Sequence, residues 1–356
     1  MGDDLGWKIS NESYYYKPGI TWSGVTSGKN SFRAYSNGFI FDSGANGFFP
    51  ADESILNTLT AYLNSCISQY VLNIINPTIN TGAGTVKKIP IILSNSEDVR
   101  NLLADLSSRC IGLSQKDWDS FETSWDFQHH PLLRKVPTIA EAFNQWQAEC
   151  DDRFNQLKTN EEELNRIFID IYGLQDELTP EVEDKDITVR KADLGRDIRS
   201  FISYAVGCMF GRYSLECEGI VYAGGNFDDV YWKYKGQAVL DKNGEVIEGG
   251  YAGISLADYH YPKFHDTDDW KAATELSFEP DADNCIPITD EEYFEDDIVG
   301  LFCAWLKKAY GEVVLEDNSG EFVREETDIT QYDIPYIKKI SLIHKVREVQ
   351  ALIGFS

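Results

Sequence analysis

Histidine and acidic residues meet at two places in the sequence, the combination that metal binding or acid–base chemistry requires. His129 and His130 follow Asp126, and His260 and His265 lie among four aspartates. Histidines five residues apart in a loop do not share a helical face, and an Asp-rich loop in an acidic protein is more often a solvated surface. We therefore predict no metal site at either place.

Two glycine-rich stretches and one Asn-Pro step are the next candidates for chemistry. Gly82-Ala83-Gly84 and Gly224-Gly225 could hold a phosphate or a cofactor if each joined a strand to the start of a helix, and the sequence frames neither in that way. Asn76-Pro77-Thr78 shares only its first half with the Asn-Pro-Pro-aromatic motif that grips the amino group of a flipped base. There is no GxSxG turn and no cysteine in a recognisable catalytic setting. We predict no catalytic residue and no cofactor site in this chain.

Basic, amide and aromatic residues near the start of the chain favour nucleic acid instead. Lys and Arg neutralise phosphates, while Asn and Arg can form paired hydrogen bonds to adenine and guanine. The ordinary alternative is that these are solvated surface residues. The candidate DNA-binding residues are Lys17, Trp22, Lys29, Asn30, Arg33, Lys87 and Lys88.

The distribution of charge keeps this interpretation open. The chain has a formal net charge of −27, which argues against DNA binding because phosphate contacts come from cations. Residues 1–100, however, hold seven Lys or Arg against eight Asp or Glu, so the acidic excess lies in the rest of the chain. We infer a functional boundary near residue 93, followed by a region that should avoid phosphate backbones.

Length and composition bound the class of protein. With 356 residues, 42% of them hydrophobic, two or three packed units are expected. No apolar run approaches the roughly 20 residues of a membrane-spanning helix, and Asp3 and Asp4 stand where a secretory signal would be basic. Seven scattered cysteines without a CxxC pair fit reduced thiols. We expect a cytoplasmic protein with no membrane partner.

Glycine and apolar patterns predict the elements of the first part. Short aromatic stretches broken by glycines between Tyr14 and Phe49 predict an antiparallel sheet. From Ile55 to Ile74 apolar residues recur at steps of three and four, which predicts one long helix ended by Asn76-Pro77.

Amphipathic helices dominate the rest of the chain. The capping-box pattern Ser94-x-x-Glu97 opens a helix that should bury Val99, Leu102, Leu103 and Leu106. Apolar stripes predict further helices over 139–157, 164–171 and 194–209. Thr289-x-x-Glu292 opens a last helix that should bury Phe294, Ile298, Leu301, Phe302 and Trp305.

Two further features belong to this region. Residues 238–247 predict a hairpin around an Asn243-Gly244 turn. Trp118, Trp125 and Phe127 are expected to pack between helices rather than to stack on bases.

These elements predict an α+β fold, in which a β-rich target-recognition portion with a flanking long helix is followed by a mostly helical region with a small β-hairpin. We expect a partial DNA target-recognition domain at 1–92 and a helical connector or bundle at 93–175. A C-terminal helical domain with a β-hairpin insert should occupy 176–356.

Longer blocks of the sequence resemble the adenine-specific DNA methylases of the PglX type from BREX phage-defence systems. Residues 19–50, 56–65 and 87–91 are similar to the closing half of that family's target-recognition region, and more loosely to recognition domains of type I and type IIG restriction systems. The stretches DWDSFETSWDFQHHPLL (117–133) and ELNRIFIDIYGLQDELTPEV (163–182) are similar to signatures of the family. Blocks at 193–225 and 286–299 extend the resemblance over most of 13–315, whereas 316–356 show no family pattern.

The resemblance implies a function. Proteins of this family carry a Rossmann-like methyltransferase domain ahead of these segments, which binds S-adenosylmethionine and methylates the exocyclic amine of adenine. None of its catalytic or cofactor-binding residues can be carried onto this chain. We therefore expect the DNA-recognition and scaffolding portion of such an enzyme, inactive alone.

The partners expected from the resemblance are double-stranded DNA, a methyltransferase catalytic domain or chain, and other BREX subunits. The alternative is a protein-interaction module that docks other BREX subunits without touching DNA.

Overall fold

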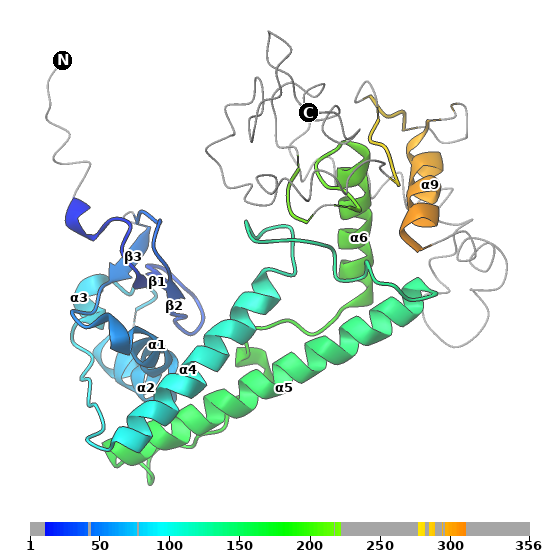
Figure 1. Ribbon diagram of the computed structural model, residues 1–356. Coiled ribbons are helices and arrows are strands. Elements are labelled where there is room, and N and C mark those ends of the chain that lie inside the picture. The colour runs from blue at the N-terminus through cyan, green and yellow to red at the C-terminus, as the bar shows by residue number, and fades with distance from the viewer. Residues whose placement is uncertain are drawn as a thin grey trace, which may run out of the picture. The chain divides into compact units, whose positions relative to one another are not determined.

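The computed structural model describes residues 11–41, 44–76, 78–216, 218–221, 277–281, 285–288, 294 and 296–310. The α+β fold is confirmed, because three short strands come first and helices follow (Figure 1). The elements before residue 90 are η1 (Glu12–Tyr14), β1 (Gly19–Ser23), β2 (Arg33–Tyr35), β3 (Ala45–Phe48), η2 (Glu53–Ile55), α1 (Leu56–Asn64), α2 (Cys66–Ile75) and α3 (Ala83–Val86). After these come α4 (Glu97–Trp118), α5 (Ile139–Tyr172), η3 (Asp184–Asp186), α6 (Leu194–Met209) and α9 (Ile298–Tyr310).

The predicted antiparallel sheet is present, with β1 between β2 and β3. Ile20 of β1 pairs with Ala34 in β2 and with Phe48 in β3, and its side chain is fully buried. Aromatic side chains support the sheet near its edges, where the ring of Phe49 lies 5.3 Å from Phe41 and 6.4 Å from Tyr35 between centroids. Such pairs add stability beyond the area that they bury.

The single helix predicted over 55–74 is two helices. Ser65 adopts an extended backbone (φ −70°, ψ 161°) between α1 and α2. Its hydroxyl donates to the carbonyl of Tyr62 at 2.6 Å and accepts from the N–H of Ser68 at 3.4 Å, so one side chain ends α1 and caps α2. The break keeps Leu63 and Ile67 buried on either side, which is why apolar spacing did not reveal it.

The start of α4 also differs from the prediction. The hydroxyl of Ser96, rather than that of Ser94, accepts from the N–H of Val99 at 3.4 Å. Leu103 and Leu106 are buried as predicted, whereas Leu102 is exposed. The predicted stripe was one position too wide for the face that α4 turns to the core.

The two stripes predicted at 139–157 and 164–171 belong to one 34-residue helix, α5. The last helix, α9, begins at Ile298, and Phe294 before it is exposed instead of buried. Residues 289–292, which were predicted to open this helix, and the hairpin predicted at 238–247 lie outside the described residues.

The chain forms two compact units. Unit 1 comprises Met1–Asp117 and Cys150–Lys191, and unit 2 comprises Trp118–Glu149 and Ala192–Ser356. Helix α5 therefore contributes residues 150–172 to unit 1 and residues 139–149 to unit 2. The division into 1–92, 93–175 and 176–356 stays a prediction.

Each unit has its own core. In unit 1 the sheet packs on α1, and one continuous cluster joins Trp22 and Phe32 to Leu63, Leu103 and Phe168. The core of unit 2 is aromatic. Its rings come from Phe127, Phe201, Tyr204, Tyr213 and Trp305. Among the helices that the structure describes, none has both the length and the apolar character needed to cross a bilayer.

Candidate nucleic-acid interface

Trp22 of β1 anchors the loop that contains Thr81. Its side chain is 3% exposed, and the indole Nε1 donates to the carbonyl oxygen of Thr81 at 2.8 Å. A ring buried in this way has no free face for a base. Trp22 thus belongs to the core under the loop that contains Thr81, and we do not retain it as a DNA contact.

Backbone hydrogen bonds join this loop to a second one. The N–H of Thr26 donates to the carbonyl of Ile79 at 3.0 Å, and the N–H of Thr81 donates to the carbonyl of Gly24 at 2.8 Å. Between these bonds Val25 and Asn80 form an antiparallel bridge. We call residues 24–26 and 79–81 the loop ribbon.

Asn76 holds the second strand of the loop ribbon in place. Its Nδ2 donates to the carbonyl of Asn80 at 3.0 Å and to the hydroxyl of Thr81 at 3.2 Å. The side-chain amide of Asn76, in the Asn76-Pro77-Thr78 step, is therefore engaged in hydrogen bonds within the protein. Nothing in this geometry turns its amide toward a base.

Lys87 and Lys88 follow the loop ribbon closely in the chain. Helix α3 begins two residues after Thr81 and ends at Val86, and both lysine side chains are exposed. Within the described part of the chain, neither lysine forms an ion pair with an acidic side chain. Exposed cations of this kind are available to a phosphate.

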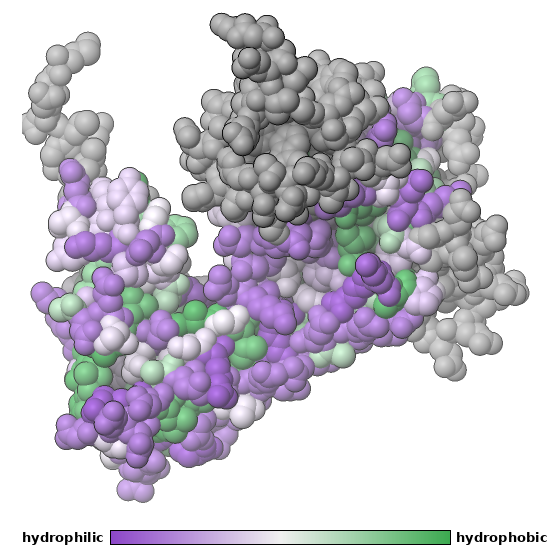
Figure 2. Space-filling view, in the orientation of Figure 1, coloured by the Kyte–Doolittle hydropathy of each residue, from purple (hydrophilic) through white to green (hydrophobic). Residues whose placement is uncertain are grey.

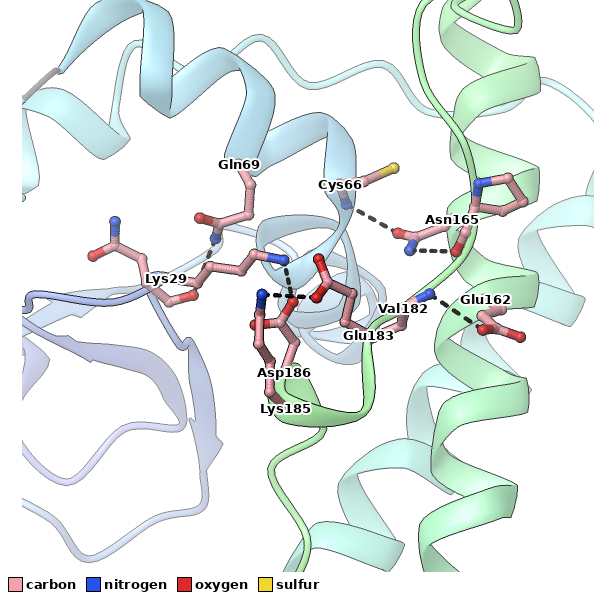
Figure 3. A network of polar contacts seen from close by, with 11 residues as sticks. Lys29, Cys66, Gln69, Glu162, Asn165, Val182, Glu183, Lys185 and Asp186 are labelled. Carbon is pink, nitrogen blue, oxygen red and sulfur yellow. Dashed lines mark hydrogen bonds and ion pairs between the residues drawn. The ribbon is translucent and has the colours of Figure 1, made fainter.

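Lys29 has an acidic partner instead. Its ammonium nitrogen lies 2.5 Å from Oδ2 of Asp186 in η3, and its side chain is 63% exposed while that of Asp186 is 17% exposed. Figure 3 shows Lys29 extending from the loop after β1 toward Asp186, with the Lys185–Glu183 pair alongside. A phosphate would have to compete with this carboxylate for Lys29.

Arg33 also faces negative charge. Burial lowers the pKa of its guanidinium, and the charge of Glu161 in α5 raises it in part. Burial in turn raises the pKa of Glu161 to about 7, an effect that Arg33 opposes. Arg33 thus interacts electrostatically with an acidic residue of the helical part of unit 1.

Asn30 and Lys17 complete the predicted set. Asn30 accepts at its backbone oxygen from Nε2 of Gln69 at 3.0 Å, and its Oδ1 is buried without a hydrogen-bond partner among the described residues. Paired bonds from Asn30 to adenine would need the side chain to turn outward. The ammonium of Lys17 lies 5.4 Å from the ring centroid of Tyr14.

Three amide side chains that the sequence did not single out join segments of unit 1 that are distant in the chain. Oδ1 of Asn64 accepts from the N–H of Phe32 at 2.9 Å, and its Nδ2 donates to the carbonyl of the same residue at 2.9 Å. Asn165 of α5 accepts from the N–H of Cys66 at 2.9 Å and donates to the carbonyl of Pro180 at 3.1 Å (Figure 3). Gln69 is the third. No sequence signal marks such residues, because their partners are distant in the chain.

The histidine cluster at 129–130, which the structure describes, does not assemble a metal site. His130 is buried, accepts at Nδ1 from the N–H of Leu132 at 3.2 Å, and has its pKa lowered to about 3 by burial. Nε2 of His129 lies 3.7 Å from Oε1 of Glu218. Across the described residues, no group of three or more His, Cys, Asp or Glu side chains could hold a metal ion. His260 and His265 lie outside those residues.

Apolar side chains reach solvent at two other places. Ile91, Ile92 and Leu93 of unit 1 are 43–49% exposed beside a pocket of about 300 Å³ lined by α1, residues 91–94 and α4. Figure 2 shows apolar surface over the region of α1, α2 and α4. In unit 2, Phe127 is buried as predicted, but Trp118 is 51% exposed and Trp125 is 87% exposed, so these two residues do not form the predicted packing between helices.

The described residues do not fit S-adenosylmethionine. Binding would call for a strand, a glycine turn and a helix whose first amides face the ligand. The described strands form an antiparallel sheet, and Gly82-Ala83-Gly84 leads into α3, which has four residues and follows an isolated bridge. Gly224 and Gly225 are outside the described residues.

Two curated bacterial proteins match the chain over nearly all of its length. The adenine-specific methyltransferase PglX of Lacticaseibacillus casei (strain Zhang) is 39% identical over 316 residues, which are 86% of this chain and 22% of that protein. The adenine-specific methyltransferase BrxX of Escherichia coli O9:H4 (strain HS) is 30% identical over 338 residues, 89% of this chain and 24% of that protein. No family model matches the chain.

Both relatives are adenine-specific methyltransferases, and this chain is related to that class of protein over almost its whole sequence. Within the class it belongs to the PglX-type proteins of BREX systems, which confirms the resemblance of the sequence blocks. The chain spans less than a quarter of the length of either relative.

Proposed function

We propose that this chain is the DNA-recognition and scaffolding part of an adenine-specific DNA methyltransferase of a BREX phage-defence system. Methyl transfer, with S-adenosylmethionine, would be carried out by another part of the longer protein or by a partner chain, in the cytoplasm. The observation that supports this most directly is the loop ribbon followed by Lys87 and Lys88. It combines a fixed backbone with two exposed cations that lack an acidic partner in the described chain.

The structure divides the predicted cations by their surroundings. Lys29 is paired with Asp186 and Arg33 interacts electrostatically with Glu161, so part of their charge is already offset within the protein. Lys87 and Lys88 have no such neighbour among the described residues and should provide more of the phosphate affinity. We therefore place the DNA contact at the loop ribbon and α3, with Lys29 and Arg33 as secondary or structural residues.

The helices suit a scaffolding role. Helix α5 contributes residues 150–172 to unit 1 and residues 139–149 to unit 2, so the two units share one helix. The described residues of this chain would bind and orient DNA. They hold no group that we assign to the transfer of the methyl group.

Charge reversal at the lysine pair tests the proposal. The double variant Lys87→Glu/Lys88→Glu should abolish binding of the chain to a short mixed-sequence duplex at low salt, measured by fluorescence anisotropy, because cationic contacts supply non-specific affinity. Lys307→Glu/Lys308→Glu is the matched control, since these are also consecutive exposed lysines, in α9. This control should retain most of the binding.

Equal loss in both double variants would contradict a local interface and point to an effect of net charge. Failure of the folded wild-type chain to bind any duplex at low salt would contradict DNA recognition itself.

A second candidate function is docking of other BREX subunits without DNA contact. The specific observation in its favour is Trp125, since exposed tryptophans are frequent hot spots of protein interfaces and this side chain is 87% exposed. Under this candidate Trp125→Ala should abolish pull-down of a BREX subunit, while Lys87→Glu/Lys88→Glu should leave it intact. If instead Lys87→Glu/Lys88→Glu abolishes binding to duplex DNA and Trp125→Ala leaves that binding intact, the first candidate is favoured.

A further inference from the structure

The loop ribbon places an aliphatic and an amide side chain next to each other. Val25 and Asn80 are directly paired in the antiparallel bridge, and such partners project from the same face with Cβ atoms about 5 Å apart. Val25 is 64% exposed and Asn80 is exposed. Among the described residues, Asn80 has a partner for its backbone carbonyl, and none is found for its side-chain amide.

The neighbouring residues fix which way this face points. Thr81, next to Asn80, is 1% exposed and receives the indole N–H of Trp22 at its carbonyl. Since consecutive side chains of an extended segment alternate between faces, the side chain of Asn80 is directed away from the core. The pair Val25–Asn80 is therefore an outward-facing feature held by a rigid base.

An A·T base pair presents a matching pattern in the major groove. Adenine offers the N7 acceptor and the N6 donor that an asparagine amide can engage with two hydrogen bonds, and thymine offers a methyl group that prefers apolar contact. The major groove also admits a two-stranded ribbon. The amide and the aliphatic side chain of one bridge can thus address the two bases of one pair.

Resting on the proposed function, we propose that the loop ribbon enters the major groove and reads one A·T pair, with Asn80 on adenine and Val25 on the thymine methyl. Lys87 and Lys88 contact the phosphates that border the groove. Helix α3 separates these lysines from the loop ribbon and is about 6 Å long at 1.5 Å per residue. The major groove is about 12 Å wide, so this separation fits lysines at the border of a groove that the loop ribbon enters.

The test begins with the wild-type chain and a random duplex library, from which bound molecules are recovered and sequenced. Val25→Ala and Asn80→Ala are selected in parallel, with thermal melts to verify folding. Ile92→Ala and Asn101→Ala are the controls, because they truncate one exposed aliphatic and one exposed amide side chain of unit 1 outside the loop ribbon.

The expected result is a wild-type motif that contains a fixed A·T pair. Both loop-ribbon variants should lose the preference at that same pair, each by about 10-fold, which is the scale of a single good base contact. The controls should keep the motif. Replacing the thymine of this pair by uracil, which lacks the methyl group, should weaken the wild-type chain and leave Val25→Ala unaffected.

Different outcomes overturn different statements. If wild type binds duplex DNA but both variants keep every preference, the assignment of Val25 and Asn80 is wrong. If uracil has no effect on wild type, the assignment of Val25 to the thymine methyl is wrong. In both cases DNA recognition stands. If folded wild-type protein binds no duplex, this inference and the proposed function both fall.

Discussion

At the scale of single residues, Glu161 is an acid that the fold makes harder to ionise. Burial raises its pKa from 4.5 to about 7, with Asp186 adding to the rise and Arg33 and Lys29 opposing it. The folded state binds this proton more tightly than the unfolded state, so protonation of Glu161 stabilises the folded protein. This contribution to stability is complete below about pH 4.5 and is lost as the pH rises through about 7.

Replacing Glu161 by glutamine, which cannot ionise, should remove this dependence. Between pH 5 and pH 8 wild type should lose stability that Glu161→Gln keeps. The free energy of unfolding of the variant relative to wild type should therefore rise by about 1 kcal/mol over this range, after allowing for the partial exposure of Glu161. Urea denaturation at several pH values measures the difference. Glu53→Gln, at an exposed position, is the control, and a constant gap between Glu161→Gln and wild type would disprove the assignment.

Asn165 is a second residue whose effect can be measured. Its side chain is buried and joins the N–H of Cys66 to the carbonyl of Pro180. In Asn165→Ala both groups lose their partner, so we expect a loss of about 1–3 kcal/mol of stability in urea denaturation. Asn101→Ala, at an exposed position of α4, should change stability by less than about 0.5 kcal/mol. Equal effects would show that Asn165 has no special structural role.

At the scale of elements, the junction of α1 and α2 depends on one hydroxyl. Ser65 is buried and both ends α1 and caps α2. Ser65→Ala should lower the free energy of unfolding by about 1 kcal/mol, the usual cost of a lost N-cap, and reduce the urea midpoint. Ser108→Ala is the control, because its exposed hydroxyl in α4 donates to the carbonyl of Ala104 and accepts from Nδ2 of Asn57 but caps no helix. A stability change in that control as large as in Ser65→Ala would contradict the capping argument.

The same junction shows what a sequence discloses about its elements. Apolar spacing predicted helical residues from 55 to 74 correctly, since burial of one face produces that spacing whether or not the backbone is continuous. It could not locate the break, which depends on the local bonds of Ser65. For the same reason two stripes in α5 looked like two helices, although no backbone feature separates them.

Candidate site residues followed a similar pattern. The basic, amide and aromatic residues near the start of the chain drew attention to Lys87 and Lys88, which the structure leaves exposed. It could not show that Lys29 meets Asp186, because the two are 157 residues apart in the chain. Trp22 illustrates the opposite case, in which an aromatic residue beside basic ones belongs to the core.

At the scale of the whole molecule, charge is the dominant constraint on the proposed DNA binding. With a net charge of −27, the chain repels a polyanion at long range, and affinity must come from local contacts. In unit 1 Lys29 is already paired with Asp186, and the charge of Glu161 acts on Arg33. Binding by the isolated chain should therefore be weak and confined to low ionic strength.

The dependence of DNA affinity on salt concentration measures how many phosphate contacts the protein makes. Each phosphate neutralised in duplex DNA contributes about −0.9 to the slope of log K against log salt, because one condensed counterion is released. If Lys87 and Lys88 each contact a phosphate, Lys87→Gln/Lys88→Gln should make the slope less steep by about 1.8 in anisotropy titrations. Lys307→Gln/Lys308→Gln changes the net charge equally and should leave the slope unchanged, because α9 lies outside the proposed interface. A similar change in both would mean that overall repulsion, not contact at the loop ribbon and α3, governs the affinity.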